Sequence, residues 1–160
     1  MSNPFGFDRI KQNIQRVKKD VPKILASVTR RYFLSSWEKQ GYDGKAWAEV
    51  QRRVPGTKAN KYAKPAARTR QILVGSGRAY LKKEVNDSLK TCNWDEIVFV
   101  VKAPYAKVHN EGLKAGRGSG FTMPQRQFMP IQGKGQPADL TEIQLKVIKR
   151  ETDKAWKINS

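Results

Sequence analysis

Apolar residues in the first forty positions recur at intervals of three and four, which is the spacing of one face of a helix. Pro22 interrupts the pattern, because proline lacks the amide hydrogen of the helical ladder and its ring clashes with the preceding turn. We therefore predict two helices, near residues 7–20 and 22–39, with a kink between them. The apolar stripe comprises Ile10, Ile14, Val17, Val21, Ile24, Leu25, Val28 and Tyr32.

Residues 41–70 have no such period and are interrupted by glycine and proline, so we predict a long irregular segment. Its second half is basic and contains no acidic residue. A block of like charge is usually solvated and flexible, and the alternative is an arm that becomes ordered against a partner or nucleic acid. The basic side chains are Arg52, Arg53, Lys58, Lys61, Lys64, Arg68 and Arg70.

Short elements separated by turns are predicted beyond residue 70. Residues 71–74 form an apolar, strand-like run that a Gly-Ser-Gly turn at 75–77 ends. A short helix or strand follows over 80–89. Residues 96–102 are rich in β-branched and aromatic side chains and give the clearest strand of the chain.

The next segments combine a helix with extended chain. Residues 103–112 predict a short helix that Gly112 ends, because glycine readily adopts the left-handed conformation of a helix C-terminus. Residues 112–120 predict a flexible basic loop. Pro124 and Pro130 both oppose helix, so residues 121–130 should be extended.

A last helix is predicted near the C-terminus, with Asp139 as its N-cap and Glu142 three positions later. The order of elements favours one α+β domain over residues 1–160, in which the terminal helices pack on a small, mostly antiparallel sheet with long basic loops.

The charge of the chain indicates its partners rather than its fold. There are 32 Lys and Arg against 14 Asp and Glu, a formal net charge of +18. Such a chain attracts nucleic acid or an acidic protein surface, and its self-association is opposed unless salt or a partner screens the charge. We expect no membrane partner, since no apolar run approaches the roughly 20 residues of a membrane span.

Candidate catalytic groups are few. His109 and Cys92 flank the predicted strand, but no third group is present to orient them, and a zinc site needs about four ligands. A nuclease needs clustered carboxylates, and only residues 43–45 place an acid two positions before a lysine. We therefore expect no enzyme, cofactor or metal. The loop with Lys114 and Arg117 is either an ordinary surface loop or a contact for phosphates.

Four short motifs occur in order along the chain: GKAW at 44–47, ILVGSG at 72–77, YAKVHNEG at 105–112 and MPQRQFMP at 123–130. Together they resemble the phage virion morphogenesis family, also called the tail-completion family, which includes a Mu-like tail protein. The resemblance covers roughly residues 30–157. Ala79 occupies a position where the family pattern usually has leucine.

The resemblance implies a structural subunit at the head–tail junction or the head-proximal end of a phage tail. Such a protein would be made in the bacterial host cytoplasm and incorporated into the virion. We expect it to form a ring around the DNA passage, of six copies to match a tail tube, between connector or adaptor proteins and tail tube proteins. The alternative is a free, sequence-independent nucleic-acid-binding protein.

Two sets of residues are the predicted contact sites. The extended segment 123–130 and the short helix before it suit a subunit or partner interface, and the alternative for Phe128 is a core residue. The predicted interface set is Tyr105, His109, Met123, Arg126, Phe128 and Met129. The predicted set facing DNA or an acidic partner is Arg52, Arg53, Lys58, Lys61, Lys64, Arg68, Arg70, Lys114 and Arg117.

Overall fold

The computed structural model describes residues 7–74, 80–118, 120–131 and 140–159. Within these ranges the chain combines α-helices with short antiparallel hairpins, which confirms the predicted α+β class. The predicted single sheet is wrong, because the described strands form three separate two-stranded hairpins. The Gly-Ser-Gly turn at 75–77 and the predicted N-cap Asp139 lie outside the described residues.

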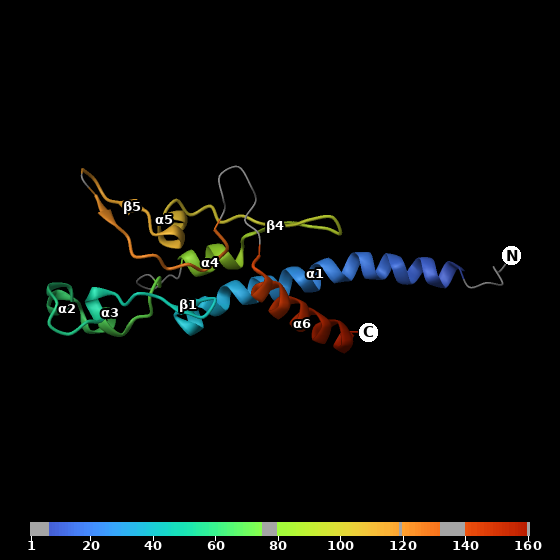
Figure 1. Cartoon of the computed structure of the whole chain (residues 1–160), viewed down its shortest axis with the longest axis horizontal. Helices are drawn as coiled ribbons and strands as arrows, with labels where there is room; N and C mark the ends of the chain where they lie inside the picture. Colours follow the sequence, from blue (N-terminus) through green and yellow to red (C-terminus); the bar gives the residue numbers. More distant parts are fainter. Residues whose placement is uncertain (1–6, 75–79, 119, 132–139, 160) are drawn as a thin grey trace.

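The first helix, α1 (Phe7–Lys39), is continuous through Pro22, so the prediction of two helices is wrong (Figure 1). Pro22 is buried, and α1 packs against the last helix, α6 (Glu142–Asn159), and against α4 (Tyr80–Asn86). Proline removes only one hydrogen bond of the ladder. Tertiary packing of the turns that follow stabilises the helix and offsets that loss.

Residues 41–74 are more ordered than the sequence predicts. A hairpin of β1 (Gly41–Tyr42) and β2 (Lys45–Ala46) is followed by three short helical elements. Thr57 caps the second of these, its Oγ1 accepting a hydrogen bond from the Asn60 amide at 3.1 Å. The three elements are η1 (Gln51–Arg53), α2 (Lys58–Tyr62) and α3 (Pro65–Thr69).

The apolar run at 71–74 forms no strand. Leu73 has a left-handed backbone (φ 58°), and the Ile72 amide donates to the Gln40 side-chain oxygen at 2.8 Å instead of to a neighbouring strand. Ile72 is buried in the core. The run is therefore apolar because it packs against the core from a turn, and not because it pairs with another strand.

The predicted central strand exists but is short. β3 (Leu89–Cys92) pairs with β4 (Ile97–Phe99), with an irregularity in register between Leu89 and Thr91. The predicted helix is confirmed as α5 (Ala106–Glu111), and Gly112 ends it in the left-handed region at φ 71°. A side chain at Gly112 would also meet the Gln125 Cβ at 3.0 Å.

The predicted flexible loop after Gly112 contains a third hairpin. β5 (Lys114–Ala115) pairs with β6 (Phe121–Thr122), and extended chain follows as predicted. The C-terminal helix is also confirmed, although its cap involves different residues. The Gln144 amide donates to Thr141 Oγ1 at 3.4 Å, and the Thr141 amide donates to Gln144 Oε1 at 3.1 Å. This reciprocal pair is a capping box.

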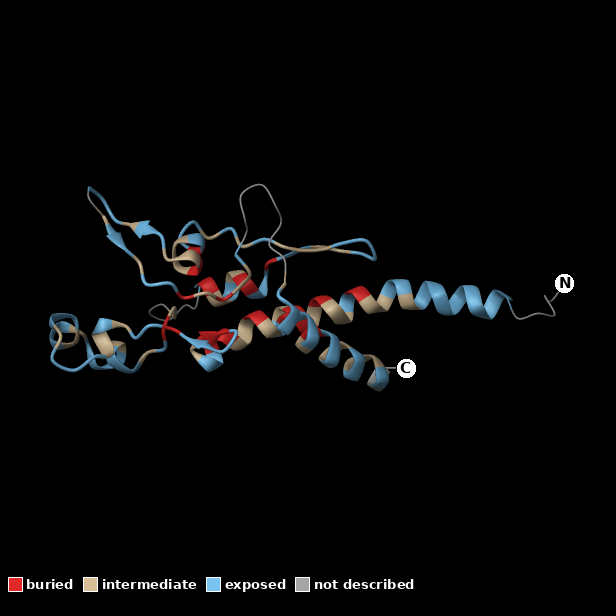
Figure 2. Ribbon diagram, viewed as in Figure 1, coloured by how far each residue is buried: buried red, intermediate tan, exposed pale blue. Residues whose placement is uncertain are grey.

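An aromatic core joins the elements. The Trp37 ring lies 5.7 Å from Trp47 and 5.3 Å from Phe128, and Phe33 lies 5.5 Å from Phe99 between ring centroids. Figure 2 shows that the buried residues gather around the C-terminal half of α1, whereas its N-terminal half extends beyond the other elements and is exposed. The extended segment after β6 lies against α5 and the chain that follows β2.

Candidate functional site: a pocket lined by arginine

Three of the four sequence motifs meet at the extended segment after β6. The Trp47 indole donates to the Gln127 carbonyl oxygen at 2.7 Å. The Arg126 amide donates to the His109 carbonyl oxygen at 2.8 Å. Asn110 Oδ1 accepts the amides of Phe128 at 2.9 Å and Met129 at 3.2 Å. Residues far apart in sequence are thus held together by hydrogen bonds to one backbone segment.

A pocket of about 830 Å³ lies beside this junction, between η1, α4, α5 and the chain from β6 to Arg126. Four of the six predicted interface residues line this pocket, together with one residue of the set predicted to face DNA or an acidic partner. Its other walls are mainly apolar and aromatic, including Leu73, Val74 and Phe121. The predicted residues in its lining are Tyr105, His109, Met123, Arg126 and Arg52.

Arg126 is the most buried charged group of the pocket, with only 5% of its surface exposed. Its Nε donates to the Ala48 carbonyl oxygen at 3.2 Å. In the described part of the chain, no carboxylate lies within ion-pair distance of its guanidinium. Burial, and then the charge of Arg52, lower the pKa of Arg126, while Glu49 acts in the opposite direction.

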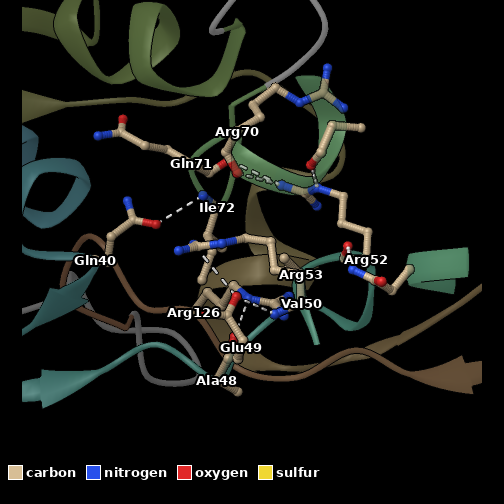
Figure 3. A network of polar contacts seen from close by, with 12 residues as sticks. Gln40, Ala48, Glu49, Val50, Arg52, Arg53, Arg70, Gln71, Ile72 and Arg126 are labelled. Atoms are coloured by element: carbon tan, nitrogen blue, oxygen red, sulfur yellow. Dashed lines mark hydrogen bonds and ion pairs between the residues drawn. The ribbon is translucent and has the colours of Figure 1, made fainter. Parts of the chain in front are cut away.

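Arg52 organises the basic segment rather than facing solvent. Its Nε donates to the Ala67 carbonyl oxygen at 2.9 Å, and its Nη2 donates to those of Arg70 at 3.2 Å and Gln71 at 3.1 Å (Figure 3). Burial and then the charges of Arg70 and Arg53 lower the pKa of Arg52. These bonds fold residues 51–71 back on themselves, which is the physical reason that the irregular-segment prediction is wrong.

The carboxylate of Glu49, which lines the pocket, already has polar partners. Glu49 forms an ion pair with Arg53 at 3.5 Å, and the Glu49 Oε1 also accepts the amide of Val50 at 2.8 Å. Figure 3 shows Glu49 close to Arg53 and Arg126, whereas Arg70 lies away from it. Arg52 and Arg126, the two arginines of the pocket lining, are therefore left without a carboxylate partner in the described structure.

His109 is half-buried at the pocket wall, and its Nδ1 is buried without a hydrogen-bond partner in the described structure. The ring lies edge-on to Tyr105, with centroids 6.3 Å apart. Burial, and then the charge of Arg126, lower the pKa of His109 from its usual 6.5. The imidazole is consequently neutral near pH 7.

We expect the pH dependence of stability to report this shift. The unfolded chain takes up the proton before the folded chain does, so the contribution of His109 is fully present above about pH 6.5 and is lost as pH falls through that value toward the folded pKa. Urea unfolding measures the free energy of unfolding at about pH 7.5 and 5.5. The decrease from the higher to the lower pH should be smaller in His109→Gln than in the original chain. An equal loss in both would contradict the shift. Since the chain has one histidine, proton NMR reads its pKa directly.

The remaining predicted interface residues do not lie in this pocket. Phe128 is 1% exposed and packs against Trp37, so the prediction that it contacts a partner is wrong for the folded chain. Met129 is half-buried and packs against the core. Asn110, which the sequence analysis missed, is the residue that fixes this segment. Its one sequence signal is its place four positions after Ala106, on the helical face that is buried.

The predicted basic set divides into two groups. Arg52, Arg53 and Arg70 are partly buried, and Arg52 lines the pocket whereas Arg53 and Arg70 do not. The others are exposed on α2, α3 and the β5–β6 hairpin. Among these, Arg68 donates to the carbonyl oxygens of Ala63 at 3.1 Å and Lys61 at 3.3 Å. The exposed residues are Lys58, Lys61, Lys64, Arg68, Lys114 and Arg117.

Across the described ranges, no helix is both long and apolar enough to cross a membrane. The same ranges contain no group of three or more His, Cys, Asp or Glu side chains placed to hold a metal ion. Comparison with known protein families, curated proteins and solved structures finds no match for this chain.

Proposed function

We propose that this chain is a structural assembly subunit of a tailed-phage particle, which forms a ring at the head–tail junction or the head-proximal end of the tail. Its neighbours would be connector or adaptor proteins and tail tube proteins, and its place the virion. The order of the four motifs supports the family, and the N-terminal half of α1 supports the mode of assembly. No catalytic role is included in this proposal.

The observation that carries the assembly role is an exposed apolar stripe on α1. All side chains from residue 7 to 16 are exposed, over roughly 15 Å at the helical rise of 1.5 Å per residue. Ile10 and Ile14 are each 52% exposed and are four residues apart, so they share one face. A helix of this kind is stabilised mainly by covering its apolar face, which a neighbouring copy can do.

A contact between this helical arm and a different surface of the next copy is heterologous. Repeating such a contact closes a ring when the rotation per subunit is a simple fraction of a turn. Six copies are the number that we expect. The charge of +18 opposes this association, so raising the salt concentration should strengthen it.

We expect Ile10→Lys combined with Ile14→Lys to convert the assembly into monomers. Burying one isoleucine contributes about 1.5–3 kcal/mol, so losing two should weaken association at least a hundredfold. Mass photometry and electron microscopy of the purified chain measure this. The matched control is Gln12→Lys combined with Gln15→Lys, which adds the same charge away from the stripe and should leave the ring intact. A chain that is monomeric at every salt concentration and absent from particles would refute the proposal.

Sequence-independent nucleic-acid binding is a second candidate, because Lys58, Lys61 and Lys64 are exposed and, in the described structure, form no ion pair. Phosphate contacts of this kind weaken steeply as salt rises, which is the opposite of the dependence expected for self-association. Measuring duplex DNA binding and solution mass over the same salt series separates the two. A monomer that binds DNA tightly at low salt would favour the second candidate.

A further inference from the structure

We propose that the arginine-lined pocket binds a carboxylate side chain of an acidic partner protein, presented on a short extended segment with apolar neighbours. This inference concerns a different surface from the helical arm, and it does not require the ring.

The pocket has more positive charge than the described residues neutralise. Arg52 and Arg126 both line it, and the carboxylate of Glu49, which also lines it, is already paired with Arg53. The side chains of Arg52 and Arg126 donate hydrogen bonds to backbone carbonyl oxygens. Carbonyl oxygens satisfy N–H donors but carry no net charge. A buried charge left without a counterion is unfavourable, and an incoming anion would relieve that cost.

His109 provides a second, independent observation. Its Nδ1 is buried without a hydrogen-bond partner in the described structure, at the wall of the same pocket. Most buried polar atoms of folded proteins have a partner, and this atom lies in the wall of the pocket, where a bound group could supply one. An anion beside the ring would favour the protonated imidazolium, whose two N–H groups both donate.

The shape of the site favours a protein carboxylate over a nucleic-acid phosphate. Arg126 is almost completely buried, so only a group on a slender, flexible stem can reach its guanidinium. A planar guanidinium can bond both oxygens of a carboxylate. Apolar and aromatic walls, including Tyr105, Met123 and Pro124, would accept the side chains on either side of the acid. A rigid duplex presents its phosphates on a broad polar surface instead.

The charge of the whole chain indicates the source of the acid. With a net charge of +18, a second copy is repelled at long range, whereas an acidic protein is attracted. The occupant is therefore a different chain with acidic character. Binding by a second copy is an outcome that the experiment can detect, because it would occur in the purified protein alone.

The test uses a short capped peptide with a central glutamate between leucines, a matched peptide with glutamine, and a thymidine oligonucleotide. Titration calorimetry measures affinity, and proton NMR follows the single histidine. We expect the glutamate peptide to bind at least about tenfold more tightly than the glutamine peptide and to raise the pKa of His109. Arg126→Gln should weaken glutamate-peptide binding by about tenfold or more, and Lys149→Gln, which removes an exposed charge on α6, should not.

Tyr105→Glu keeps the test decisive if Arg126→Gln fails to fold, because Tyr105 is exposed at the pocket and a carboxylate there would occupy the site from within. This variant should fold, raise the pKa of His109 and lose peptide binding. The proposal would be overturned if the two peptides bound with equal affinity or if neither bound. It would also be overturned if the oligonucleotide displaced the peptide in a manner that depends on Arg126. So would a His109 signal that shifts with protein concentration alone, since that indicates a second copy in the pocket.

Discussion

Phe128→Ala is expected to lower the free energy of unfolding by about 3–5 kcal/mol, the largest loss from any single truncation considered for this chain. The side chain is 1% exposed and lies 5.3 Å from the Trp37 ring, in the middle of the core. Truncation removes its buried apolar surface and leaves a cavity that the surrounding rings fill only in part. Urea unfolding followed by tryptophan fluorescence measures the loss.

Phe121→Ala is the matched control for this prediction, because Phe121 is 57% exposed on β6. It should change stability by less than about 0.5 kcal/mol. Phe128→Asp should not fold at all, since it places a carboxylate in the aromatic core. A stable Phe128→Asp chain that merely fails to assemble would instead restore Phe128 as an interface residue.

The elements that could be predicted from sequence are those whose cause is local. The helical conformation of α1 and the turn that Gly112 requires depend on a few adjacent residues, and both are confirmed. The strand predicted at 96–102 is confirmed only over Ile97–Phe99, where it pairs with β3. The three-hairpin arrangement could not be foreseen, because strand pairing depends on contacts that no local pattern specifies.

Long-range contacts explain the errors. Pro22 is a strong local signal for a helix end, but the packing of α1 against α6 depends on residues more than a hundred positions later. The basic segment looked irregular because its fold depends on Arg52, which binds carbonyl oxygens 15 to 19 residues away. Such contacts cannot be predicted from the number of glycines and prolines or from runs of like charge.

The candidate site was predicted in part. The motifs at 105–112 and 123–130 suggested that Tyr105, His109 and Arg126 act together, and the pocket contains all three. The same pocket contains Arg52, which is 74 positions before Arg126 in the sequence. Only tertiary structure can specify such a contact. Phe128 was assigned to an interface because alternate residues of an extended segment can face either the core or solvent, and the sequence does not indicate which.

Asn110→Ala should have the second large effect, a loss of about 2–4 kcal/mol of stability. Asn110 Oδ1 accepts the amides of Phe128 at 2.9 Å and Met129 at 3.2 Å, and the side chain is buried. Alanine would leave both amides without this acceptor, and each unsatisfied buried donor costs about 1–3 kcal/mol. Chemical denaturation measures the loss, and Asn86→Ala at the exposed end of α4 is the control.

Hydrogen exchange distinguishes the mechanism of this loss from simple global destabilisation. In Asn110→Ala, the amides of Phe128 and Met129 should exchange faster relative to those of α1 than they do in the original chain. The Arg126 amide is bonded to the His109 carbonyl oxygen, so loosening this segment should also move Arg126 away from the ring. The pKa of His109 should then rise toward 6.5, because both causes of its depression weaken. Uniform acceleration of exchange with an unchanged His109 pKa would show that Asn110 stabilises the whole fold without positioning the pocket.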